Sequence, residues 1–117
     1  MPESSAPAPG ARLLSRDVLS RPLEHEPAPG ALAASPVSAS CTLSSLGPVE
    51  VGVWELTPGT VRDTEVDEVF VVLAGAGRVE FEDGEVVELA PGVAVRLTAG
   101  ERTTWTVTDT VRKIWVA

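Results

Sequence analysis

The sequence predicts an all-β protein in which residues 36–117 fold into a single antiparallel β-barrel. Apolar and polar residues alternate through most of this stretch, as they do in strands with one buried face. Turn-forming pairs such as Asp83-Gly84 and Pro91-Gly92 separate the alternating runs at short intervals. Aromatic residues make up only 4% of the chain, and Val, a β-branched residue that favours strands, supplies much of the apolar content. A chain of 117 residues is long enough for one core and too short for two ordinary domains.

The expected strands are short and follow one another closely. The residues from Asp67 to Leu73 form a nearly continuous apolar run, which is typical of a strand covered on both faces. The small residues from Ala74 to Gly77 predict a turn after it. In chain order, the expected strands are residues 37–43, 49–56, 67–73, 78–82, 86–89, 93–97, 103–107 and 111–116.

A leader precedes the expected barrel and spans residues 1–35. Residues 1 to about 11 are so rich in Pro, Ala and Ser that they predict disorder. Residues 11–19 can form two helical turns with Leu13, Leu14 and Val18 on one side. Residues 21–35 predict an extended arm that lies over the barrel or over a partner subunit, because residues before proline favour extended conformations.

The charge and cysteine content exclude several kinds of partner. A net charge of −8 and a pI of about 4.5 argue against nucleic acids and anionic membrane surfaces, which attract basic proteins. Cys41 is the only cysteine, so no disulfide can form within the chain. The first residues lack the apolar core of a signal peptide, and no run is long enough to span a membrane. We therefore expect a cytoplasmic protein.

The turns and flanking residues of the barrel resemble those of the cupin superfamily, in particular small single-domain cupins of the ureidoglycine aminohydrolase type. The resemblance covers residues 36–117 and implies a jelly-roll-like barrel. The segments that carry it are Gly52-Val-Trp-Glu-Leu-Thr-Pro-Gly59, Asp67-Glu68, Leu73-Ala-Gly75, Asp83-Gly84-Glu85, Pro91-Gly92, Ala99-Gly100, Trp105 and Arg112-Lys113.

In cupins, three histidines and one glutamate hold a metal inside the barrel. Placed on the turns of this chain, the glutamate position is Glu68, and the histidine positions are Arg62, Thr64 and Thr103. Only Glu68 is retained, and one carboxylate does not hold a transition metal well. The only histidine, His25, is in the leader, where we expect an exposed residue without a role. The resemblance therefore leads us to expect a degenerate metal site and no cofactor.

The alternation of side chains predicts which residues face the barrel interior. Arg62, Thr64, Glu68 and Phe70 are expected on one inward face. Glu65 and Asp67 are not expected to share the interior with Glu68 unless a bulge interrupts the strand, since neighbouring strand residues point to opposite faces. Glu68 in an apolar interior is the candidate general acid or base. The alternative is a purely structural ion pair between Glu68 and Arg62.

The candidate ligand-binding residues surround Glu68. Thr103 and Trp105 are expected on the inward face of a second strand, with Trp105 lining a pocket. Trp54 can stack on a ligand, although core packing is the more frequent role of such a residue. Together, the expected ligand-binding set is Arg62, Thr64, Phe70, Thr103, Trp105 and Trp54. Lys113 and Trp115 lie on the face opposite to Ile114 and are expected to meet a partner subunit.

Three functions fit these observations. The first is binding of a small organic ligand in a metal-free barrel, with Glu68 as acid or base in a lyase, isomerase or cyclase type of step. The second, implied by the resemblance, is a metal-dependent hydrolase of ureido or amide nitrogen. The third is a non-catalytic sensor or assembly protein. A homodimer is expected for each of them, and the missing imidazoles favour the first function over the second.

Overall fold

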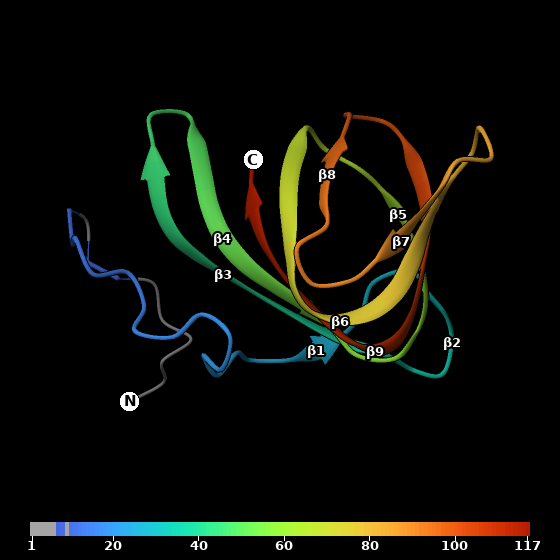
Figure 1. Ribbon diagram of the computed structural model, residues 1–117, viewed down its shortest axis with the longest axis horizontal. Helices are drawn as coiled ribbons and strands as arrows, with labels where there is room; N and C mark the ends of the chain where they lie inside the picture. Colours follow the sequence, from blue (N-terminus) through green and yellow to red (C-terminus); the bar gives the residue numbers. More distant parts are fainter. Residues whose placement is uncertain (1–6, 9) are drawn as a thin grey trace.

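Nine antiparallel strands form one sheet that curls into a nearly closed barrel (Figure 1). The computed structural model describes residues 7, 8 and 10–117, and these contain no helix. The all-β class expected from the sequence is therefore confirmed. The strands are β1 (Glu26–Pro27), β2 (Ala31–Ala33), β3 (Val37–Leu46), β4 (Val49–Leu56), β5 (Gly59–Thr64), β6 (Glu68–Phe81), β7 (Val86–Leu89), β8 (Ala94–Leu97) and β9 (Arg102–Val116).

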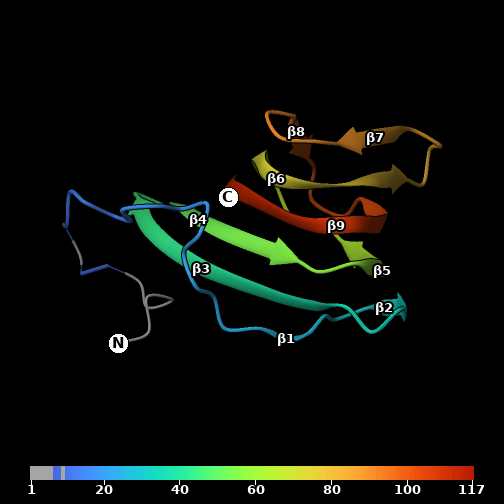
Figure 2. The same cartoon turned by 60° about the horizontal axis from the view of Figure 1, so that its bottom comes forward.

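Strand β9 is the centre of the sheet. One of its edges pairs with β4 and β5, and the other edge pairs with β6. Strand β6 in turn pairs with β8 near its beginning and with β7 near its end. Figure 2 shows how β6 and β9 run side by side, with β3 and β4 on one side of them and β7 and β8 on the other. Residues on β6 and β9 therefore contribute to every part of the barrel.

The turn expected from Ala74 to Gly77 is absent, because these residues lie inside the long strand β6. The pairing of β6 with β9 shifts register there at three places, so the strand bends without ending. Gly75 has a φ of 98°, and a Cβ at this position would lie 2.1 Å from the carbonyl oxygen of Thr110. Glycine is required for this conformation and close approach, which explains why a turn-like composition occurs within a strand.

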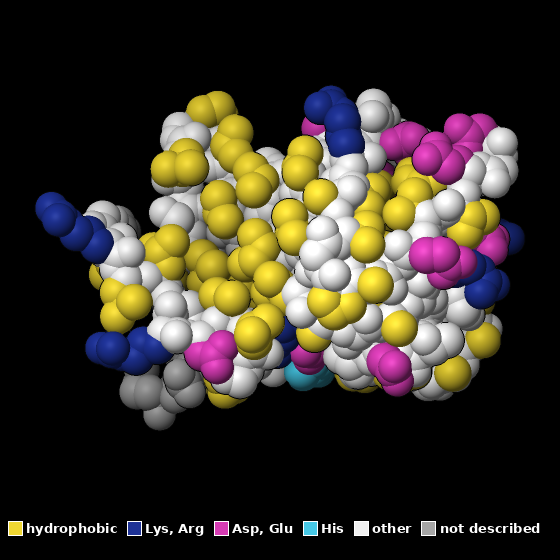
Figure 3. Space-filling view, in the orientation of Figure 1, with side chains coloured by type: hydrophobic (Ala, Val, Ile, Leu, Met, Phe, Trp, Pro, Cys, Tyr) yellow, Lys and Arg dark blue, Asp and Glu magenta, His cyan; other side chains and the backbone are white. Residues whose placement is uncertain are grey.

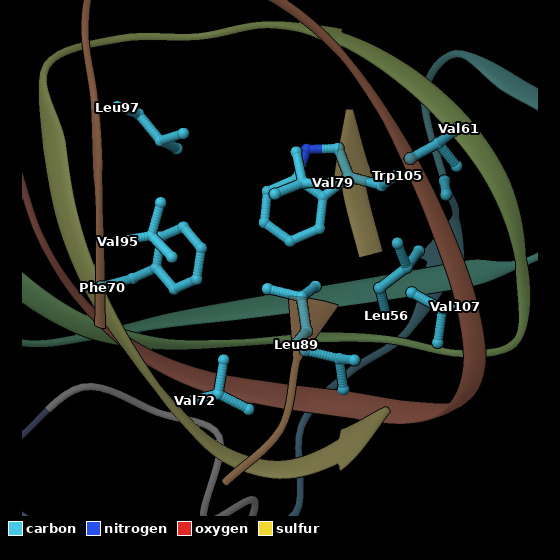
Figure 4. Packing of buried hydrophobic residues seen from close by; sticks show 12 residues of the cluster. Leu56, Val61, Phe70, Val72, Val79, Leu89, Val95, Leu97, Trp105 and Val107 are labelled. Carbon is cyan, nitrogen blue, oxygen red and sulfur yellow. The ribbon is translucent and has the colours of Figure 1, made fainter. Parts of the chain in front are cut away.

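The main core fills the barrel interior. Phe70 and Val72 of β6 and Trp105 and Val107 of β9 are at most 3% exposed and direct their side chains into it (Figure 4). The residues of this cluster are Ala28, Leu56, Val61, Phe70, Val72, Val79, Leu89, Val95, Leu97, Trp105, Val107 and Val111.

A second, smaller core lies on the outer face of β3 and β4, under the N-terminal arm, which we define as residues 10–35. Leu14, Val18 and Leu23 of the arm pack against a cluster that contains Cys41 and Val53. Residues 11–19 form bends and a turn instead of the expected helix, with Leu14 and Val18 packed against the sheet and Leu13 and Leu19 exposed. The segment expected to be extended, residues 21–35, contributes two edge strands to the sheet: β1 pairs with β3, and β2 pairs with β5. The expected disordered leader falls largely outside the described residues.

Two ionic side chains of the barrel fasten the arm. Arg112 of β9 donates hydrogen bonds to the carbonyl oxygens of Val18 and Arg21, at 2.9 and 2.8 Å. The same guanidinium pairs with Glu55 at 2.9 Å, and Glu55 also bonds His25 at 2.5 Å. His25, for which no role was expected, therefore links the arm to β4 and lies on the outer face of the sheet.

Part of the outer face remains uncovered. Figure 3 shows hydrophobic side chains over the β3–β4 hairpin and the neighbouring ends of β6 and β9. Leu46, Val69, Val71 and Val116 are each at least 38% exposed. Among the described residues, no helix has the length and apolar character needed to cross a bilayer.

Candidate functional site

A buried ion pair occupies the barrel interior. The Nζ of Lys113, on β9, donates a hydrogen bond to Oε2 of Glu68 at the start of β6, at a distance of 2.6 Å. The two side chains are only 6% and 12% exposed. The two residues come from neighbouring strands, in which Val69 pairs with Val116 and Val72 pairs with Lys113.

Three aromatic rings enclose the ammonium group. The Nζ of Lys113 lies 4.3 Å from the ring centre of Phe70, 4.6 Å from that of Trp54 and 5.0 Å from that of Trp105. The Trp105 ring also contacts the rings of Trp54 and Phe70, with centres 5.4 and 5.5 Å apart. The negative faces of the rings stabilise a cation at such distances. We call Trp54, Phe70 and Trp105 the aromatic box.

A second carboxylate, Glu65, also faces the interior. Its Oε2 accepts hydrogen bonds from the hydroxyl of Thr103 at 2.6 Å and from the indole N–H of Trp105 at 3.0 Å. The backbone of Glu65 is fixed by hydrogen bonds with Glu101 and Gly100, at 2.8 and 2.9 Å. Glu65 and Glu68 both face inward because residues 65–67 connect two strands and interrupt the alternation, which is the exception that the expectation allowed.

A cavity of about 410 Å³ opens beside these groups. Burial lowers the pKa of Lys113, and the carboxylate of Glu68 opposes this effect. Burial raises the pKa of Asp63, and the negative charge of Glu65 raises it further. The cavity is lined by Ser40, Glu50, Trp54, Val61, Asp63, Glu65, Val66, Glu68, Trp105, Lys113, Trp115 and Ala117.

Trp115 reaches the cavity wall because Gly52 leaves room for it. A Cβ on Gly52 would lie 2.2 Å from Cζ2 of the Trp115 indole and 2.6 Å from the carbonyl oxygen of Cys41. No larger residue fits between the strand and this ring. The glycine at this position therefore determines where one wall of the cavity lies.

The structure separates the expected ligand-binding residues into two groups. Thr103 is bonded to Glu65, and Trp54, Phe70 and Trp105 lie around the Lys113 ammonium. Arg62 and Thr64 do not, because Val61 and Asp63 occupy the inward face of β5. The expected ion pair between Glu68 and Arg62 is replaced by the pair with Lys113.

Arg62 and Thr64, together with Thr103, line a different depression, with a volume of about 680 Å³, at the rim of the barrel. Arg62 and Arg102 contribute positive charge to it, and Glu80 and Glu82 contribute negative charge. Arg62, Arg102 and Glu82 are exposed to solvent, and Glu80 is partly exposed. The charged side chains of this depression are therefore more exposed to water than Glu68 and Lys113 in the interior cavity.

The metal site implied by the cupin resemblance does not fit the residues of this chain. Arg62 and Thr64 are outside the cavity, and the hydroxyl of Thr103 is bonded to Glu65. A metal on Glu68 would lie next to the Lys113 ammonium, which already provides the positive charge. Within the part of the chain that the structure describes, no three His, Cys, Asp or Glu side chains form a group suited to a metal.

Sequence reasoning missed the partner of Glu68. The alternation correctly placed Lys113 and Trp115 opposite to Ile114, but it assigned them to the outer face. In the structure Ile114 is on the outer face, under the arm, and Lys113 and Trp115 face the interior cavity. A signal was available, since Lys113 is the only lysine in a chain with nine Lys and Arg residues together.

The fold and the site define a small barrel of the cupin class, with an ion pair and an aromatic box in its interior. A family model described as the EutQ-like cupin domain matches residues 43–115. The chain therefore belongs to the EutQ-like cupin family. No curated protein matches the chain in sequence.

Solved structures agree with this assignment. A protein of unknown function from Rhizobium leguminosarum is 30% identical, with a TM-score of 0.61, over 68% of this chain and 78% of the other. The EutQ protein of Clostridium difficile is 24% identical, with a TM-score of 0.61, over 74% of each chain. Ectoine synthase from P. lautus is 18% identical, with a TM-score of 0.60, over 74% of this chain and 67% of the other. The last two similarities establish the fold alone. The expected cupin class is confirmed, and the ureidoglycine aminohydrolase type stays a prediction.

Proposed function

We propose that the barrel binds a small organic ligand in the interior cavity, without a histidine-bound metal, and that Glu68 transfers a proton to or from it. The observation that carries this proposal is the Glu68–Lys113 pair at the wall of a cavity of about 410 Å³. Rigid indole faces beside a few polar groups are the usual composition of a small-molecule site.

The energetics of the ion pair favour a functional role. Desolvating two charges is so unfavourable that apolar residues of similar volume often stabilise a protein as well as a buried pair, or better. The purely structural alternative therefore gives little reason for an ammonium and a carboxylate in this interior. A general acid or base, in contrast, needs a desolvated group beside the space where a substrate binds.

The chemistry of the site limits the reaction class. Glu68 can accept a proton at Oε2, and Lys113 can donate one at Nζ, 2.6 Å away. This pair supports proton transfer at a carbon or heteroatom, as in lyase, isomerase or cyclase steps. Among structures with this fold are proteins named as an ectoine synthase and as DMSP lyases, which supports a catalytic proposal.

The test is a binding screen monitored by tryptophan fluorescence, because Trp54, Trp105 and Trp115 line the cavity. Small amines, aldehydes and carboxylic acids form the panel. We expect at least one compound to change the emission saturably and to raise the melting temperature. Glu68→Gln should weaken that binding or abolish turnover, whereas Glu88→Gln, on the exposed side of β7, should not. A panel without any saturable change in wild-type protein overturns the proposal and leaves the sensor or assembly role.

Elemental analysis of the purified protein addresses the hydrolase of ureido or amide nitrogen that the resemblance implied. Such an enzyme needs a metal, and a stoichiometric transition metal in the protein would refute the metal-free proposal. We also propose a cytoplasmic homodimer that uses the uncovered outer face of β6 and β9, where Val69, Val71 and Val116 are exposed. Sedimentation equilibrium of wild-type protein and of Val69→Lys tests the dimer.

A further inference from the structure

Lys113 differs from every other cation of the chain in both identity and position. The sequence contains nine Lys and Arg residues together, and the other eight are arginines. Arginine cannot be deprotonated in a protein, whereas a buried lysine can become a neutral amine. The single lysine is 5% exposed and lines the interior cavity. The chain therefore places its only side-chain amine at the wall of the cavity.

We propose that Lys113 is a nucleophile that forms an imine with a small aldehyde or ketone bound in the cavity. This inference rests on the proposed function, because it requires that the cavity admits a small organic molecule. It adds the class of substrate, a carbonyl compound, and the atom that attacks it, Nζ of Lys113.

Glu68 supplies the proton transfers that imine formation needs. Its Oε2, 2.6 Å from Nζ, takes one proton from the ammonium and leaves a neutral amine. The nitrogen lone pair then attacks the carbonyl carbon, the C=O π electrons move to oxygen, and a proton passes from nitrogen to oxygen to give a carbinolamine. The protonated Glu68 returns its proton to the hydroxyl group, which leaves as water while the C=N bond forms. The balance is one ammonium and one carbonyl group in, and one iminium and one water out.

The surroundings that hold the ammonium suit the product equally well. An iminium carries the same single positive charge, so the aromatic box and Glu68 stabilise both states. Burial lowers the pKa of Lys113, which makes the neutral amine easier to reach. Trp54 and Trp105, whose ring centres lie 4.6 and 5.0 Å from Nζ, cover part of this atom against water, which would hydrolyse the imine.

The test is reductive trapping with propanal and sodium cyanoborohydride near neutral pH. Each chain has two primary amines, the terminal α-amino group and Lys113, so mass spectrometry of Asp- and Glu-specific fragments assigns every adduct. In the unfolded chain the α-amino group should react faster, because an ordinary lysine is almost fully protonated at this pH. In the folded chain we expect the ratio of Lys113 adduct to α-amino adduct to rise by at least about tenfold.

Variants identify the cause of that reactivity. Glu68→Gln should slow trapping at Lys113 by about 100-fold, the usual contribution of a general acid or base. Glu88→Gln is the matched control and should behave as wild type. In Lys113→Arg only the α-amino group should be modified. The comparison of folded and urea-unfolded wild type needs no variant, so the test survives if a variant fails to fold.

Two results would overturn the inference. One is a folded wild-type protein whose α-amino group is alkylated while Lys113 is not. The other is trapping at Lys113 that Glu68→Gln leaves unchanged. If carbonyl compounds still quench the tryptophans in either case, the proposed ligand-binding function stands without imine chemistry. If no compound of the panel binds, both proposals fall together.

Discussion

Removing one partner of the Glu68–Lys113 pair should destabilise the barrel far more than removing both. Lys113→Met keeps an unbranched side chain of similar length but leaves the Glu68 carboxylate without its cation. The two side chains are 6% and 12% exposed, so water can compensate little. Breaking a buried pair in this way costs about 3–5 kcal/mol, whereas an apolar replacement of both partners is neutral or stabilising. We therefore expect Lys113→Met to lose about 3–5 kcal/mol and Lys113→Met/Glu68→Leu to recover most of that loss.

The measurement is urea unfolding followed by tryptophan emission, with Lys113→Met, Glu68→Leu and the double variant forming a thermodynamic cycle with wild type. Arg78→Met is the control, because the Arg78–Glu80 pair is more than 40% exposed on both sides and should contribute less than about 1 kcal/mol. A loss below about 1 kcal/mol for Lys113→Met would refute the reasoning, since it would mean that the ammonium is hydrated. A double variant as stable as wild type that no longer binds a ligand would show that the pair serves binding.

Three further outcomes are expected. Asp63→Asn should raise the melting temperature at pH 7. The gain in the free energy of unfolding should be at most about 1 kcal/mol, because the side chain is partly solvated. The raised pKa of Asp63 makes its ionised form unfavourable in the folded state, so the gain should vanish as the pH falls below the ordinary carboxyl pKa of about 3.9; a gain that grows in acid would contradict this sign. Gly52→Ala should destabilise the protein by about 1–3 kcal/mol and shift the emission of Trp115, because the new methyl group collides with that indole; unchanged emission and stability would mean that the ring is placed elsewhere. Arg112→Met should release the arm and speed tryptic cleavage within residues 10–35, because two carbonyl groups of the arm lose their donor; cleavage no faster than in the Arg78→Met control would show that packing alone holds the arm.

The strands that depend on local signals were predictable from the sequence. Asp83-Gly84 marks the β6–β7 turn, and Gly84 adopts a φ of 94° there. The bounds expected for residues 49–56 and 86–89 agree with β4 and β7. The residues from Ala74 to Gly77 misled the prediction, because a bend between paired strands and a turn use the same small residues. Only the partner strand decides between these two structures.

The site was less predictable than the fold, because alternation defines two faces without saying which is inside. In β9 both faces are buried, one by the core and the other by the arm, so the face of Lys113 could not be assigned. On β5 Val61 faces inward, so Arg62 and Thr64 do not. The alternation of inward and outward residues does not continue through the connection at residues 65–67, so it could not relate Arg62 and Thr64 to Glu68. Thr103 and Trp105, which lie within one uninterrupted strand, were placed correctly.

The central position of β9 also bears on the order in which the protein folds. In the described part of the chain, strands β4, β5 and β6 are joined to one another only through β9, which follows them in the sequence. The β3–β4 and β6–β7 hairpins can form from local contacts before β9 inserts. Until then, the edges of β4 and β6 that pair with β9 keep unpaired N–H and C=O groups. Lys113 is on β9, so its ammonium is buried in the same step in which β9 pairs with its neighbours and closes the barrel.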